Sequence, residues 1–246
     1  MGRKWTQDDL LAYNIKVVYQ DLTTFFGVTD LPPPNVGNDA LTAQHPTPSN
    51  YSISVMLNYM THMANPVPDF DNLEALTIDF VRVLFNLLCY DDARERFVML
   101  RPTLCHITSQ GRPPQLDVCI GDITNAILLV AKVDRCSRGF DPEPRLISES
   151  IAAFHNDNIM REKHLGTDPL TSMVMPGIAM HGTMPTFYKI PITPELVRAV
   201  ESGEQPEQET VVYAYRPEVP RPEEGMKPLD NRSILFSCFE CFQQFL

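Results

Sequence analysis

The stretch QLDVCIGDITNAILLVAKVDR (residues 115–135) contains two short apolar runs separated by a turn. Apolar runs of this length are typical of strands that are buried on both faces of a sheet. Charges interrupt the runs at Asp117, Lys132 and Asp134. Because side chains alternate along a strand, Lys132 and Asp134 point to the same face, about 6.5 Å apart. A hairpin between the two runs would bring Asp117 opposite them, so this stretch is the candidate place for chemistry.

A helix is expected before this stretch, over residues 72–90. Asp71 and Glu74 resemble a capping box, and apolar residues then recur at helical spacing. The charged sequence DDARER follows, and residues 97–109 then read as a strand interrupted near Pro102. The sequence therefore predicts a helix that leads into the sheet.

Further elements follow from periodicity and from cap residues. Thr193, Pro194 and Gly203 mark a short helix, since threonine is a common N-cap, proline suits the first helical position and glycine ends helices. Other helices are expected at residues 52–63, from Asp141 to Gly166, and at 231–246 with Asp230 as the cap. The remaining strands are expected at residues 116–120, 126–133, 172–181, 186–192 and 211–215.

The N-terminal segment is expected to wrap over the core. Residues 7–29 alternate polar and apolar positions, and the proline-rich sequence that follows must be extended. Phe25 and Phe26 need burial. We therefore divide the chain into an arm, loop and short helix (1–70) that pack on a core with a C-terminal helix (71–246).

The overall composition is that of an ordinary globular protein, with 246 residues of which 43% are hydrophobic. No apolar run approaches the roughly 20 residues that cross a bilayer, and the N-terminus lacks the apolar core of a signal peptide. The sequence thus predicts an intracellular, cytoplasmic protein without a membrane partner. Its six cysteines are expected to be reduced, and Cys238 and Cys241, although a CxxC pair, to pack in the core.

The formal net charge of −11 opposes nucleic-acid binding, which depends on lysine and arginine neutralising phosphates. Binding would need a local basic patch, and solvated surface charge is the alternative interpretation. The candidate residues are Lys132, Arg135, Arg138, Arg145, Arg94, Arg96 and Arg101.

Several other site types find little support in the sequence. The histidines show no HxxxH or HExxH spacing, and no GxGxxG, phosphate-binding glycine loop or GxSxG is present. Cys105 and His106 are adjacent, but neighbours on a strand face opposite sides, which disfavours a nucleophile and base pair.

The order helix, three strands, helix, strand describes an α/β fold with a small mixed sheet between helices. Over residues 72–192 this layout resembles the restriction-endonuclease-like αβββαβ core of the PD-(D/E)XK nuclease superfamily, in which Asp117 would be the first acidic residue of the motif. A closer resemblance covers nearly the whole chain. The segments DDLLAYNIKVVYQDLTTFFGV, DPEPRLISESIAAF, TFYKIPIT and EGMKPLDNRS resemble an uncharacterised family of fungal intracellular proteins.

The resemblance implies a catalytic set of Asp117, Lys132 and Asp134. In such nucleases two carboxylates hold a divalent cation, usually magnesium, and a lysine orients the attacking water. Here Lys132 stands where the motif expects Glu or Asp, and Asp134 stands where it expects Lys. The acid is thus displaced along the strand by several ångströms, far more than catalytic placement tolerates.

Metal ligands would be Asp117, Asp134 and Glu74, with Asp79 or Glu149 as other acids that could complete an altered site. We expect a nuclease-like protein that has lost cleavage and serves as a binding or assembly module. The alternative is a divergent magnesium-dependent nuclease that hydrolyses DNA or RNA.

Two further interpretations concern structure rather than catalysis. Lys132 could form a structural ion pair with Asp117 or Asp134. The C-terminal sequence ILFSCFECFQQFL carries four phenylalanines, more than one buried stripe needs, which favours self-association through this helix.

Overall fold

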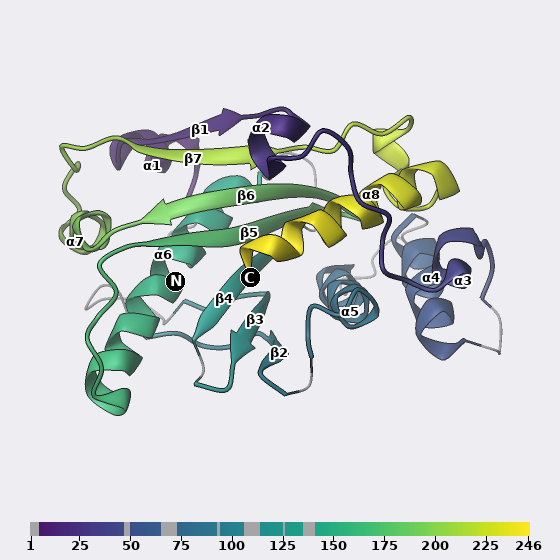
Figure 1. Ribbon diagram of the computed structural model, residues 1–246. Coiled ribbons are helices and arrows are strands. Elements are labelled where there is room, and N and C mark those ends of the chain that lie inside the picture. The colour runs from purple at the N-terminus through teal and green to yellow at the C-terminus, as the bar shows by residue number, and fades with distance from the viewer. Residues whose placement is uncertain are drawn as a thin grey trace.

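The computed structural model describes residues 5–46, 50–64, 73–92, 94–105, 114–124, 126–134 and 141–246, apart from the side chains of Ala64, Leu73, Glu74, Leu128, Val130 and Asp134. Within these residues, seven strands form one mixed sheet in the order β1-β7-β6-β5-β4-β3-β2 (Figure 1). The strands are β1 Ile15–Tyr19, β2 Arg96–Leu100, β3 Val118–Asp122, β4 Ile127–Asp134, β5 Met173–His181, β6 Met184–Ile192 and β7 Thr210–Tyr215. The α-helices are α1 Gln7–Ala12, α2 Leu22–Phe26, α3 Asn38–Thr42, α4 Tyr51–Ala64, α5 Leu73–Leu87, α6 Glu143–Met160, α7 Pro194–Ser202 and α8 Leu229–Phe242.

The centre of the fold follows the expected order of elements. Helix α5 leads into β2, β3 and β4, which pair as antiparallel neighbours. Helix α6 then connects β4 to β5, and these two strands are parallel. A crossover helix is the usual link between parallel strands, because the chain must return to the other end of the sheet before the second strand begins, and a short turn cannot span that distance.

Helices cover both faces of the sheet, which explains the continuous apolar runs in its strands. In Figure 1, α8 crosses in front of the sheet and α6 lies behind it. Ala131 and Val133 of β4 belong to the buried cluster that includes side chains of α5 and α8. Cys119 of β3 and Ala179 of β5 belong to the opposite cluster, together with side chains of α6 and α7. Alternate residues of β4 therefore face different helices.

The cap residues bound the helices as the sequence predicts. The hydroxyl of Thr193 accepts a hydrogen bond from the amide of Leu196 at the start of α7. Gly203 ends this helix with φ of 73°, a backbone conformation that glycine adopts without a Cβ penalty. Gly166 ends the short π-helical continuation of α6 in the same way, with φ of 63°.

The N-terminal segment contributes to the sheet, and the sheet is larger than the small one expected. Strand β1 pairs with β7 in parallel, so Ile15 lies opposite Thr210. Phe25 and Phe26 of α2 are buried against the sheet, as their size requires. The sequence alternation in this segment therefore reflects a strand, whereas we expected an arm without one.

Other expected boundaries differ or cannot be compared. Strand β2 ends at Leu100, and the next residue, Arg101, has φ of 50°, which does not continue a strand. Residues 106–109 and the start of the capping box at Asp71 lie outside the described residues. Helix α8 begins after Pro228, so Asp230 lies in its first turn instead of capping it.

Helix α8 is a core helix, which contradicts the expectation that its phenylalanines are left over for self-association. Phe236, Phe239 and Phe242 are fully buried, and Phe245 packs against the same cluster. Cys238 and Cys241 are buried with them, as predicted for core cysteines. Phe25 of α2, Phe187 of β6 and Tyr90, which follows α5, all contact phenylalanines of α8. The helix is therefore buried over more of its surface than the single apolar stripe that we expected. Among the described helices, none is both long and apolar enough to cross a membrane.

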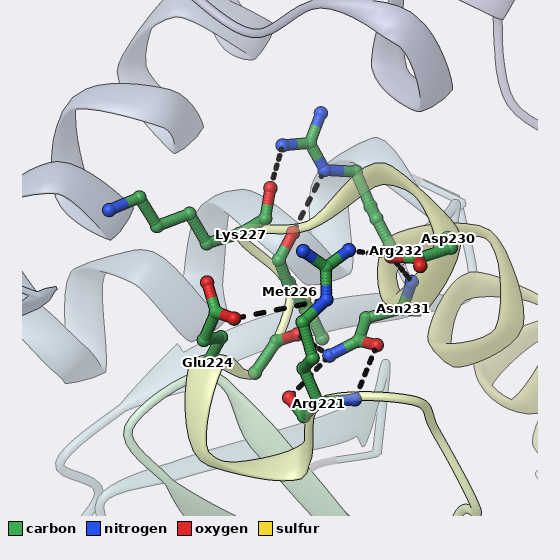
Figure 2. A network of polar contacts seen from close by, with 8 residues as sticks. Arg221, Glu224, Met226, Lys227, Asp230, Asn231 and Arg232 are labelled. Carbon is green, nitrogen blue, oxygen red and sulfur yellow. Dashed lines mark hydrogen bonds and ion pairs between the residues drawn. The ribbon is translucent and has the colours of Figure 1, made fainter.

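A buried arginine fixes the start of α8 (Figure 2). Arg232 is 1% exposed, and its guanidinium donates to backbone carbonyls on both sides of it. The acceptors are Met226 at 3.1 Å, Lys227 at 3.3 Å, Ala40 at 3.3 Å and Ala43 at 2.7 Å. Since these carbonyls come from the middle and the C-cap residue of α3 and from the turn before α8, one side chain joins segments that lie far apart in the sequence.

Candidate functional site

Three charged side chains meet on the face of the sheet that α6 covers. The Nζ atom of Lys132 lies 2.7 Å from Asp117 Oδ2 and 2.9 Å from Glu149 Oε1. Asp117 immediately precedes β3, Lys132 is on β4 and Glu149 is on α6. The hairpin and the crossover helix therefore bring together residues that are up to 32 positions apart in the sequence.

Strand alternation explains why a lysine is buried here. Ala131 and Val133 face the α5 and α8 side, so Lys132 must face α6. Its side chain is 1% exposed, and its ammonium touches two carboxylates. Asp117 is held in turn by the amide of Val133, which donates to Asp117 Oδ2 at 3.1 Å. A buried charge is tolerable only when it is paired and hydrogen-bonded in this way.

Glu149 has one satisfied and one unsatisfied oxygen. Its Oε1 atom contacts Lys132 and lies 3.9 Å from a terminal nitrogen of Arg145. Its Oε2 atom is buried and has no hydrogen-bond partner among the described residues. An acceptor that is left unpaired in a low-dielectric environment is costly, so this oxygen is the natural place for a water or a cation.

Burial raises the pKa of Glu149 to about 7, and the nearby Lys132 ammonium offsets part of that shift. Asp117 adds to the increase, because a second carboxylate disfavours ionisation. Close contact with an ammonium would by itself lower the pKa of a carboxyl. The pKa of Glu149 is nevertheless raised, because the cost of burying its charge outweighs the stabilisation that the Lys132 ammonium provides.

The structure gathers only part of the predicted site. Asp117 and Lys132 meet as predicted, and Glu149, named as one of several acids on helices, completes the cluster. Asp134 ends β4 opposite His181 of β5, but its side chain lies outside the described part of the chain. Glu149 could have been singled out because it lies three residues after Leu146 and four before Ala153, so it shares a helix face with buried apolar residues.

The acids expected on α5 are placed differently. Helix α5 packs on the opposite face of the sheet from α6, with Phe80 and Val81 buried there. Asp79 lies 3.7 Å from Arg82 of the same helix and is part-exposed. Glu74 is in the first turn of α5, and its side chain lies outside the described residues.

A divalent cation fits this cluster poorly while Lys132 bridges the two acids. Across the described residues, no group of three histidine, cysteine, aspartate or glutamate side chains could hold a metal ion. The orphan Oε2 atom of Glu149 could serve as one ligand. The space between the two carboxylates, where a hard cation would be placed, contains the Lys132 ammonium instead.

The candidate basic patch is partly neutralised. Arg96 lies 3.5 Å from Asp92, and Arg145 approaches Glu149. Arg135 and Arg138 lie outside the described residues.

The adjacent residues Cys105 and His106 can be compared only in part, because His106 lies outside the described residues. The main-chain amide of Cys105 donates a hydrogen bond to the side-chain oxygen of Asn156, so this loop is attached to α6.

A second buried carboxylate organises the start of α6. Glu143 Oε2 accepts hydrogen bonds from the hydroxyls of Tyr19 at 2.9 Å and Tyr188 at 3.0 Å, and Glu143 Oε1 accepts one from Gln7 at 3.1 Å. Burial and the neighbouring Glu143 carboxylate raise the pKa of Tyr188, so its hydroxyl remains a donor. This group links α1, β1 and β6 to α6, and its role is structural.

The buried carboxyl of Asp157, further along α6, should make the stability of the folded protein depend on pH. Burial raises the pKa of its carboxyl to about 7, while its Oδ2 atom accepts from the amide of Ile127 at 3.0 Å and its Oδ1 atom has no partner among the described residues. The unfolded chain ionises near the ordinary value of 3.8, whereas the folded chain retains the proton up to about pH 7. The contribution to stability is therefore fully present below about pH 4 and is lost as the pH rises through about 7.

We expect the free energy of unfolding of Asp157→Asn to rise relative to that of the wild type by about 2–3 kcal/mol between pH 5 and pH 8, because the wild type loses the contribution of the protonated carboxyl over this range. Asparagine keeps the acceptor for Ile127 but does not ionise. Urea unfolding at pH 5, 6, 7 and 8 measures the effect. A constant difference between the two proteins across this range would show that Asp157 does not titrate there.

No family model matches this sequence, and no curated protein is significantly similar to it. The site is therefore interpreted from its own geometry and chemistry.

Proposed function

We propose that this protein is a nuclease-like module that has lost cleavage and acts by binding or assembly. The order of α5, β2, β3, β4, α6 and β5 supports a restriction-endonuclease-like core, because it has the αβββαβ layout with the last two strands parallel. In that arrangement Asp117 immediately precedes the second strand, β3, and Lys132 and Asp134 belong to the third, β4.

One observation supports the loss of cleavage most directly. Lys132 Nζ lies within 3 Å of oxygens of both Asp117 and Glu149, where an active enzyme of this type would hold its cation. An ammonium neutralises the two acids as a cation would. Unlike a metal ion, it cannot lower the pKa of a bound water or coordinate a phosphate oxygen.

The exchanged positions of the lysine and the aspartate on β4 also support the loss of cleavage. The position expected to hold an acidic ligand carries Lys132, and the position expected to hold the lysine carries Asp134. A cation site needs several oxygen ligands around one point, and this exchange replaces one of them with a positive charge. The remaining cluster is a buried ion triad, which maintains geometry without performing hydrolysis.

A cleavage assay tests the proposal. Purified protein is incubated with single- and double-stranded DNA and RNA in magnesium and then in manganese, with Asp117→Ala prepared in parallel. We expect no product above the level of the variant. Cleavage by the wild type that disappears in Asp117→Ala and in Glu149→Gln would refute the proposed loss of activity.

The second candidate function is a divergent metal-dependent nuclease, favoured by the unpaired Glu149 Oε2 atom. In that case Asp117 and Glu149 would hold the cation and Lys132 would move aside to stabilise the developing negative charge. The same assay separates the two functions, because only an active nuclease gives a product that depends on Asp117.

A further inference from the structure

One end of the sheet is open on the face that carries α8. In Figure 1, β5, β6 and β7 extend to the left of α8 towards α7, and no described helix lies over their front surface there. Nearer to α8, the ring of Phe187 contacts the tilted ring of Phe242 on α8, and Tyr215 contacts Phe26 on α2. This part of the face is therefore covered by the two helices. The two parts belong to the same face and differ only in what covers them.

The open part of the face is mainly apolar, apart from Lys189, which lies opposite Tyr213 and donates a hydrogen bond to the carbonyl of Phe25. Pro191 is four residues after Phe187 and Tyr213 is two before Tyr215, so alternation places both on this face. Val174 lies opposite Pro191 in the β5–β6 register. Val174 is 56% exposed and Tyr213 is 36% exposed, whereas the equivalent positions beneath α8 are buried. An uncovered apolar sheet face in an otherwise well-packed protein is typical of an interaction surface.

A groove of about 1160 Å³ runs between this open surface and α7. Its apolar lining includes Pro191, Val211 and Tyr213, and its outer wall is the loop of residues 203–209. That wall is anchored to the N-terminal segment, because Asn14 Nδ2 donates to the carbonyl of Pro206 at 3.3 Å. A contact within the folded chain therefore holds the outer wall of the groove in place.

The charges around the groove are predominantly negative. Glutamates line it at five positions, and Arg198 is the one basic residue among the lining residues described. Arg198 is already paired with Glu195 at 2.7 Å. The five positions are Glu195, Glu201, Glu204, Glu207 and Glu209.

We propose that this groove binds a segment of another protein in which lysine or arginine alternates with apolar residues. The apolar side chains of such a segment would contact Tyr213 and Pro191, and its cations would meet the glutamates of the wall. A second copy of this chain is a poor occupant, since each copy carries a net charge of −11. Phosphate backbones are excluded by the same charge. The inference deepens the binding role proposed above and rests on it.

The test measures the fluorescence anisotropy of a labelled ten-residue peptide in which lysine alternates with leucine. The wild type should bind it at least 10-fold more tightly than the variant Glu204→Gln/Glu207→Gln/Glu209→Gln. Tyr213→Ser should weaken binding to a similar extent. The matched control Glu162→Gln/Glu218→Gln/Glu223→Gln removes the same charge from exposed positions elsewhere and should change the affinity less than 2-fold.

Equal losses in the groove variant and the control would overturn the proposal, because they would indicate attraction by net charge alone. Absence of peptide binding would also overturn it. A dimeric mass in solution that becomes monomeric in Tyr213→Ser would assign the groove to a second copy instead. None of these results involves Lys132, so they leave the loss of cleavage intact. Conversely, Asp117-dependent cleavage would remove the proposed function without affecting the peptide measurement.

Discussion

Replacing Lys132 by methionine should destabilise the protein by about 3 kcal/mol at pH 8, the cost expected when a buried ion pair loses one partner. Methionine has a similar length but no charge. It would leave Asp117 and Glu149 facing each other in a buried environment with their shared ammonium removed. The measurement is the free energy of urea unfolding, followed by circular dichroism.

The loss should shrink as the pH falls from 8 to 6. Burial already raises the pKa of Glu149 to about 7, and loss of the neighbouring ammonium removes the contact that opposes this increase. At pH 6 the folded Lys132→Met variant would therefore carry a protonated Glu149 and a single negative charge. The variant Lys132→Met/Asp117→Asn/Glu149→Gln, which removes all three charges, should recover most of the stability at both pH values. A loss in the single variant that is unchanged between pH 6 and pH 8 would show that the two acids do not share the ammonium.

Exchanging the two residues of β4, in the variant Lys132→Glu/Asp134→Lys, should create a divalent-cation site. The exchange removes the ammonium from between Asp117 and Glu149 and supplies a third acidic side chain on the same face of the strand. Three carboxylates around one point are a suitable oxygen ligand set for magnesium or manganese. We expect manganese affinity to rise at least 10-fold over the wild type, measured by isothermal titration calorimetry.

The control for this exchange adds Asp117→Asn, which should return the affinity to the level of the wild type. If the exchanged protein binds manganese no better than the wild type, then Lys132 is not what prevents cation binding. A folded circular dichroism spectrum in all three proteins is required for the comparison.

Much of the central fold was predictable, because local signals there agree with the final packing. Thr193 and Gly203 bound α7 in both sequence and structure, since caps act within one helical turn. The two apolar runs of residues 115–135 became β3 and β4, because short continuous apolar runs indicate strands that are covered on both faces. The N-terminal strand β1 was missed, because its partner β7 is almost 200 residues away and no local signal reports such a pairing.

Only the part of the site that lies on the β3–β4 hairpin was predictable from the sequence. Asp117 and Lys132 are brought together by neighbouring strands, so strand geometry was sufficient. Glu149 reaches the site because α6 packs across the sheet, which depends on tertiary structure, and the sequence pattern named it only as one acid among several. The phenylalanines of α8 were misassigned for the same reason, since helices α2 and α5 supply the surfaces that bury them.

A manganese titration of the wild-type protein tests the central claim most directly, with free manganese followed by its electron paramagnetic resonance signal. If the Lys132 ammonium holds the place of the cation, the protein should show no site tighter than about 1 mM, since Glu149 Oε2 is the one buried oxygen of the described Asp117–Lys132–Glu149 cluster without a hydrogen-bond partner. One site in the low micromolar range that is lost in Asp117→Asn would contradict the account.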